Sequence, residues 1–140
     1  MSSKKGWCFM NEAANNAQDW FNKADRDLRA AEIMLKSDDP LPDMACYHAQ
    51  QCAEKYLKGY LVTRKVSFRF VHELAYLVRL CMDADKDFES LLTPASELQD
   101  YATDVRYPPE PEGFPTSEDG WAALERAKTV RQFVLSKVHP

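Results

Sequence analysis

Apolar residues recur at three- and four-residue spacing along most of this chain, which is the period of an α-helix that buries one face. In the first such segment Trp20, Ala24, Leu28 and Leu35 fall on one stripe, and charged residues fill the other side. The expected helices cover, in order, residues 17–36, about 44–64, about 72–82, about 94–104 and about 117–138. Because short connections join long helices, neighbours should run antiparallel. The pattern predicts an all-α fold, an up-and-down antiparallel bundle of four to five helices.

The segments between these helices contain residues that break or cap helices. Residues 37–42 hold two Asp and two Pro, and residues 107–115 hold four Pro and one Gly, so both are expected to be loops. Asp43 is expected to cap the second helix, and Thr116 or Ser117 the last one. Residues 66–71 read as a connector with the character of a short strand.

The length of 140 residues allows one domain and no second. Residues 1–15 show no sustained helical period, so we expect them to be a flexible leader. Residues 16–140 are then a single helical bundle. No apolar run approaches the ~20 residues of a membrane helix, and the first ten residues lack the apolar core of a secretory signal. We therefore expect a cytoplasmic protein that has no contact with a membrane.

The net charge of −4 and the pI of about 5.4 argue against generic nucleic-acid binding, which needs a basic face. The charge is unevenly spread. Residues 54–69 carry five cations and one anion, a local +4, whereas residues 83–120 carry eleven anions and two cations, a local −9. The positive segment indicates either an electropositive patch or an ordinary solvated helix face.

Cysteine spacing and motif content give no sign of a metal or a cofactor. The four cysteines form no Cys-x-x-Cys pair, and in a cytoplasmic chain such thiols are most often small buried hydrophobes. The common phosphate-loop, nucleophile-elbow and zinc-helix motifs do not occur either. We expect no metal site and no cofactor.

One line of polar residues on the second helix could bind a ligand. His48, Gln51, Lys55 and Lys58 follow one another at i, i+3, i+7 and i+10, which places them along one side of a helix. Such a line could cradle a phosphate or a base edge. The alternative is a solvated surface with an i, i+4 ion pair between Glu54 and Lys58.

A second cluster lies where the fourth helix is expected to end. Tyr101 lies in its last turns, and Arg106 and Tyr107 follow directly before a proline. Arginine offers a planar fork of donors for phosphate, and tyrosine a stacking face. The alternative is an arginine that interacts with the helix dipole. A histidine acting as general acid or base would be His48 or His72, since the third histidine is next to the C-terminus.

These residues resemble the HEPN (higher eukaryotes and prokaryotes nucleotide-binding) family over about residues 17–138. The most specific part is the run His-Ala-Gln-Gln-x-Ala-Glu-Lys-x-Leu-Lys at residues 48–58. The other matching pieces, in the same chain order, are Trp20, Ala24, Asp27-Leu28 and Ala31, then His72-Glu73-Leu74, then Arg106-Tyr107-Pro108.

The resemblance implies a helical bundle that commonly forms a homodimer. Prokaryotic members are often encoded beside a minimal nucleotidyltransferase, as a toxin–antitoxin pair, and that partner can modify a tyrosine near the active site, for which Tyr101 and Tyr107 are the nearest candidates. Active toxins of the superfamily are metal-independent RNases that carry an Arg followed, after four to six residues, by a His. This chain lacks that signature: seven residues separate Arg64 from His72 and Arg131 from His139, two separate Arg69 from His72, and Arg106 has no His near it in the sequence.

Three functions follow for this HEPN-like chain. The first is a module that binds a nucleotide or the nucleotidyltransferase partner through Gln51, Lys55, Lys58, Tyr101 and Tyr107. The second is a metal-independent RNase toxin that acts on RNA, in which Arg106 works with His48 or His72 brought from other helices. The third is a non-catalytic dimeric helical scaffold.

Overall fold

The computed structural model describes residues 7–8, 16–103 and 115–139, and these form an antiparallel bundle built around one central helix. The elements are, in chain order, β1 (Trp7–Cys8), α1 (Ala17–Lys36), α2 (Pro42–Thr63), β2 (Phe68–Arg69), α3 (Leu74–Ala84), the 3₁₀ helix η2 (Lys86–Leu91), α4 (Leu92–Thr103) and α5 (Ser117–Val138). The predicted all-α bundle is therefore confirmed. None of the helices in the described ranges combines the length and the apolarity that spanning a bilayer requires.

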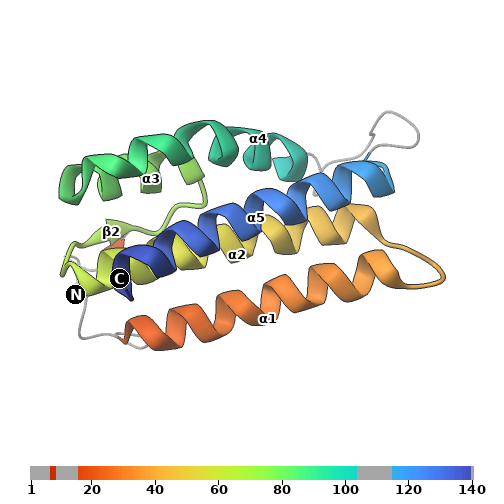
Figure 1. Ribbon diagram of the computed structural model, residues 1–140, viewed down its shortest axis with the longest axis horizontal. Coiled ribbons are helices and arrows are strands. Elements are labelled where there is room, and N and C mark those ends of the chain that lie inside the picture. The colour runs from red at the N-terminus through yellow and green to blue at the C-terminus, as the bar shows by residue number, and fades with distance from the viewer. Residues whose placement is uncertain (1–6, 9–15, 104–114, 140) are drawn as a thin grey trace.

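Helix α2 lies at the centre and contacts α1, α3, α4 and α5. Figure 1 shows α1 on one side of the α2–α5 pair, and α3 and α4 on the other. From Cys52 to Val62 every α2 residue except Lys55 is buried, including Glu54 and Lys58. The small side chains of Ala45, Ala49 and Ala53 all lie in this core and allow the surrounding helices to come close.

Local sequence explains where several helices begin and end. Asn16 caps α1 by accepting a hydrogen bond from the Gln18 backbone N–H at 2.7 Å. Thr116 caps α5, and its exchange of hydrogen bonds with Asp119 forms a capping box. The cap expected at Asp43 was wrong: α2 begins at Pro42, a favoured residue for a first helical position, and has no side-chain cap.

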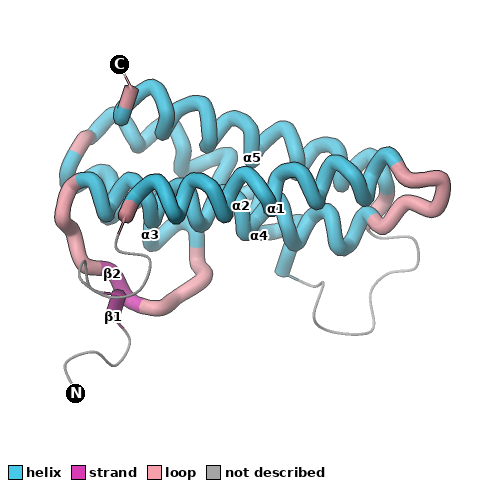
Figure 2. Tube along the Cα trace, turned by 90° about the horizontal axis from the view of Figure 1, so that it is seen from below, coloured by secondary structure: helices cyan, strands magenta, loops and turns pink. Residues whose placement is uncertain are grey.

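The connection that leaves α2 is a Schellman motif. The Val66 N–H bonds to Leu61 O and the Lys65 N–H to Val62 O, while Lys65 has a φ of 58°. The chain then forms β2, which pairs antiparallel with β1 through the partners Cys8–Phe68 and Trp7–Arg69. This two-stranded ribbon lies at the end of the bundle where α5 finishes (Figures 1 and 2). It is the short strand expected within residues 66–71.

The third and fourth helices, like the second, begin two residues away from the expected positions. The third begins at Leu74 rather than at residue 72, because the residues before it are held in extended form against α2. The fourth begins at Leu92 rather than at residue 94, since η2 runs into it directly. Cys46, Cys52 and Cys81 are buried free thiols, as expected for small hydrophobes. Burial raises the pKa of Cys46 to about 12 and that of Cys81 further.

Candidate functional site

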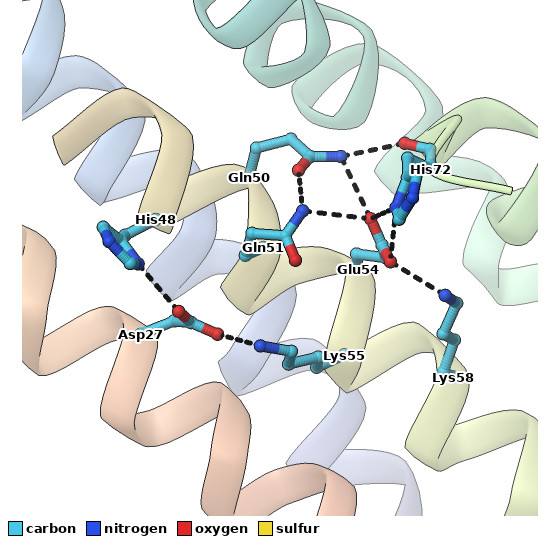
Figure 3. Close-up of polar contacts among 8 residues, drawn as sticks. All are labelled: Asp27, His48, Gln50, Gln51, Glu54, Lys55, Lys58 and His72. Carbon is cyan, nitrogen blue, oxygen red and sulfur yellow. Dashed lines mark hydrogen bonds and ion pairs between the residues drawn. The ribbon is translucent and has the colours of Figure 1, made fainter. Parts of the chain in front are cut away.

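Two polar clusters lie side by side on α2, and each consists of a carboxylate that joins a histidine to a lysine (Figure 3). In the first, which we call the Asp27 cluster, Asp27 of α1 joins His48 and Lys55 of α2. In the second, the Glu54 cluster, Glu54 of α2 joins His72 and Lys58. Helical spacing explains why His48 and Lys55 reach the same carboxylate, because residues seven apart lie two turns apart on the same face of a helix.

The Asp27 cluster bridges α1 and α2. His48 Nδ1 lies 2.8 Å from Asp27 Oδ1, and Lys55 Nζ lies 2.5 Å from Asp27 Oδ2. An ionised carboxylate only accepts hydrogen bonds, so Nδ1 of His48 carries the proton and donates it. In the neutral ring, Nε2 is then the nitrogen that carries the lone pair. The side chains of His48 and Lys55 are each 24% exposed and that of Asp27 is 12% exposed, so this cluster is open to solvent on one side.

The Glu54 cluster is the drier of the two. The Glu54 side chain is 3% exposed, and that of its partner Lys58 is 4% exposed, with Nζ 2.8 Å from Oε2. His72 Nδ1 lies 3.0 and 3.1 Å from the two carboxylate oxygens, although the ring is 61% exposed. A buried carboxylate needs such partners, because an unpaired buried charge is costly.

Two glutamine amides complete the hydrogen bonding of the Glu54 cluster. Gln50 Nε2 donates to the His72 carbonyl at 2.8 Å and lies 3.4 Å from Glu54 Oε1. Gln51 Nε2 donates to Gln50 Oε1 at 2.9 Å and lies 3.4 Å from the same glutamate oxygen. The amides therefore tie the segment before α3 to the middle of α2.

Lys58 is enclosed by aromatic rings. Its Nζ lies 5.7 Å from the ring centres of Trp20 and of Phe68, within the range of a cation–π attraction. Trp20 Nε1 is itself buried without a hydrogen-bond partner among the described residues. With its side chain enclosed in this way, Lys58 holds the core together and does not present its charge to a ligand.

A third polar cluster joins α1 to α5 on the other flank of α1. Asp25 Oδ1 accepts from Tyr56 Oη at 2.5 Å and from Arg131 Nε at 2.9 Å. Burial and the hydrogen bond to Asp25 raise the pKa of Tyr56 well above its ordinary value. The phenol therefore stays protonated and serves as a donor that links α2 to α1.

The structure thus divides the predicted line of His48, Gln51, Lys55 and Lys58 between two clusters. His48 and Lys55 meet at Asp27, Gln51 turns to Gln50 and Glu54, and Lys58 is buried. The expected Glu54–Lys58 ion pair is present.

Of the other predicted site residues, Tyr101, Arg106 and Tyr107, the structure describes only Tyr101. Tyr101 lies on α4, partly buried, with the Arg126 guanidinium 5.6 Å from its ring centre. Arg106 and Tyr107 lie outside the described residues, so their position relative to His48 and His72 stays a prediction. Within the described ranges no group of His, Cys, Asp and Glu side chains could hold a metal ion.

Asp27 and Glu54 were not predicted as site residues from the sequence, although both belong to the residues that resemble the HEPN family. Asp27 and Glu54 are ordinary charged residues of helices in the sequence, and spacing along one helix does not reveal which residue of another helix faces it. The available signal was weak: Asp27 sits beside Leu28, at the edge of the apolar stripe of α1. A carboxylate at that edge is well placed to reach a neighbouring helix.

Fold and site together define an all-α antiparallel bundle whose central helix carries histidine–carboxylate–lysine clusters. A family model described as the HEPN domain matches residues 17–138. The chain belongs to the HEPN family, as its resemblance predicted.

Two known proteins are similar to this chain. One is a protein of Methanocaldococcus jannaschii with the name "Putative toxin MJ1304", 25% identical over 128 residues, which cover 82% of this chain and 83% of that protein. The other is the crystal structure of ST0689, an archaeal HEPN homologue, with a TM-score of 0.66 and 26% sequence identity. The match covers 88% of this chain and 98% of that one.

Proposed function

We propose that this chain is the HEPN half of a prokaryotic toxin–antitoxin pair whose other half is a minimal nucleotidyltransferase. In this proposal it is a cytoplasmic homodimer, and it binds a nucleotide or its partner through the Asp27 cluster. Family membership and the toxin name of the M. jannaschii relative support the toxin role. The observation that carries the binding site is the pair of His48 and Lys55, each about a quarter exposed, on one carboxylate.

The geometry of this pair suits an anionic ligand. Lys55 keeps two N–H donors beyond the one that it gives to Asp27, and its side chain is partly exposed. Protonation of His48 at Nε2 would add a second positive charge beside it. Asp27 holds both groups in place, so little conformational entropy is lost when a phosphate binds.

Calorimetry with ATP, GTP and short RNA tests the binding site directly. We expect one of these ligands to release heat with the wild type and to bind Lys55→Ala at least ~10-fold more weakly, the loss of one charge-assisted contact. The matched control is Lys86→Ala, which removes an exposed lysine of η2. Equal binding by Lys55→Ala and by the wild type would place the ligand elsewhere, and no heat with any ligand would favour the scaffold.

A ribonuclease is the second candidate, and the orientation of His48 favours it. With Nδ1 bound to Asp27, Nε2 is free to take the proton from a ribose 2′-OH. The resulting alkoxide attacks the adjacent phosphorus, the bond to the 5′ oxygen breaks, and that oxygen takes up a proton as it leaves. A cation beside the phosphate, Lys55 or Arg106, would stabilise the extra negative charge of the transition state.

Expression in a bacterial host separates the two functions. A ribonuclease should arrest growth, and His48→Ala and Arg106→Ala should each relieve the arrest, whereas Lys86→Ala should not. Purified protein should then cleave RNA in the presence of EDTA. Harmless expression of the wild type at a verified protein level would count against the ribonuclease and leave the binding module.

A further inference from the structure

The side of α1 that faces away from the rest of the bundle carries a short basic and apolar surface. Arg26, Arg29 and Ile33 lie there at three- and four-residue spacing, and all three are exposed. Together with Ala30 they line a shallow depression that is open to solvent. We call these four residues the α1 outer face. A second depression continues it towards Lys36 at the end of the helix and is also lined by Glu32, whose carboxylate pairs with Lys36.

The two arginines of the α1 outer face have no counter-ion in the described part of the chain. Neither makes an ion pair or a hydrogen bond there, whereas Arg126 and Arg131 of α5 are each bound to a carboxylate. Arg26 and Arg29 also stand one turn apart, a spacing at which like charges repel and destabilise a helix slightly. Both guanidinium groups are therefore available to acidic groups of another molecule.

An apolar side chain lies next to these free charges. Ile33 is 56% exposed, and burying it against a partner would be favourable. An RNA backbone would use the arginines and leave the isoleucine without a contact. A second copy that presented the same face by twofold symmetry would add two more arginines, and no carboxylate of the α1 outer face, to the same small surface. The combination instead matches a helix that carries acidic residues beside apolar ones, as in groove-binding peptides.

We infer that the α1 outer face docks an acidic amphipathic helix of another protein. Carboxylates of that helix pair with Arg26 and Arg29, and an aliphatic side chain covers Ile33. The inference deepens the proposed function and rests on it: of the two ligands proposed above, it assigns the protein partner to the α1 outer face and leaves the nucleotide to the Asp27 cluster. The surface is separate from the Asp27 cluster, since Asp27 faces α2.

A designed peptide tests this surface without any assay of toxicity or nucleotide binding. The probe is a helical peptide of about 18 residues, long enough to be partly helical alone, with leucines along one side and glutamates flanking them. Its control has the same composition in an order that scatters leucines and glutamates around the helix. Binding is followed by backbone amide shifts of the isotope-labelled full chain, at low salt and again at ~0.3 M salt.

We expect the patterned peptide to shift amides of residues 26–36 and to bind at least ~10-fold more tightly than the scattered one. Arg26→Glu/Arg29→Glu should weaken it at least ~10-fold, and Ile33→Ser about 5-fold. The matched control is Arg79→Glu/Lys86→Glu, the same charge change on α3 and η2, across the bundle from α1 (Figure 1).

Four results would overturn the inference. They are no shift on α1, equal binding of both peptides, stronger shifts of the same residues with a short single-stranded RNA, and shifts of these residues on dilution alone. The third would assign the face to nucleic acid and the fourth to a second copy of this chain. A protein that binds the peptide as expected but is harmless and binds no nucleotide would refute the proposed function and leave the docking surface.

Discussion

Replacing Lys58 by methionine should cost more stability than any other removal of a single lysine from α2. Its ammonium group lies 2.8 Å from Glu54 Oε2, and both side chains are almost fully buried. Methionine keeps most of the volume and the apolar contact with Trp20 and Phe68, so the main change is the loss of the charge. Glu54 is then left as a buried carboxylate without its lysine.

Removal of one member of a buried ion pair typically costs 3–5 kcal/mol, because the remaining charge is uncompensated. Here His72 Nδ1 still binds the carboxylate, at 3.0 Å from Oε1, so we expect a loss near the lower end, about 3 kcal/mol. A folded domain is stable by about 5–15 kcal/mol. The Lys58→Met variant should therefore fold but be clearly weakened.

Urea denaturation followed by circular dichroism at 222 nm measures this loss. It avoids tryptophan fluorescence, which the lysine beside Trp20 influences directly. Lys55→Met is the matched control, since its ion pair is partly solvated and should contribute about 1 kcal/mol or less. Glu54→Gln/Lys58→Met, which removes both charges, should be more stable than Lys58→Met alone. A loss in Lys58→Met no larger than in Lys55→Met would refute the reasoning, and so would a double variant less stable than Lys58→Met.

Three further predictions concern the fold. Gly59→Ala should lower the free energy of unfolding by about 1–3 kcal/mol, although alanine has the higher helix propensity, because a Cβ at this position would overlap the ring of Phe21. An unchanged or higher Tm would contradict this. Thr116→Ala should cost about 1 kcal/mol through the lost cap of α5, and Thr116→Ser should restore it in the same Tm measurement. The hydrogen bond from Lys137 lowers the folded-state pKa of Asp85, so the stabilisation that Asp85→Asn removes should be fully present at pH 7 and should start to fall once the pH drops below the unfolded-state pKa of about 3.9. Urea titrations in which the difference between the two proteins is as large at pH 2.5 as at pH 7 would refute it.

Periodicity predicted the helices well where one face is buried and the other is solvated. The first helix, predicted over residues 17–36, has those bounds in the structure, and the cap at Thr116 was also correct. Periodicity was less accurate where a contact with residues far away in the chain decides where a helix begins. Residues 72–73 stay extended because Gln50 and Glu54 hold His72 from the neighbouring helix, and no pattern along residues 66–82 contains that information.

The candidate site was predicted only as far as one helix determines it. Spacing placed His48 and Lys55 on one side of α2, and the structure brings these two together. The same spacing included Lys58, whose environment depends on Trp20 and Phe68 from two other segments. Alignment along a helix is a local property, whereas exposure depends on which elements cover that helix.

Burial assigns different roles to two clusters that have the same chemistry. Each holds a histidine and a lysine on one carboxylate, but the Glu54–Lys58 pair is enclosed, whereas His48 and Lys55 of α2 are each 24% exposed. The ions of an enclosed pair are already stripped of water, and removing one of them lowers the stability of the fold strongly. The Glu54–Lys58 pair therefore suits a role in fixing the segment before α3. A pair that still contacts water can exchange that water for a phosphate at less cost. The Asp27 cluster is therefore the one in which substitution should change function and leave the fold intact.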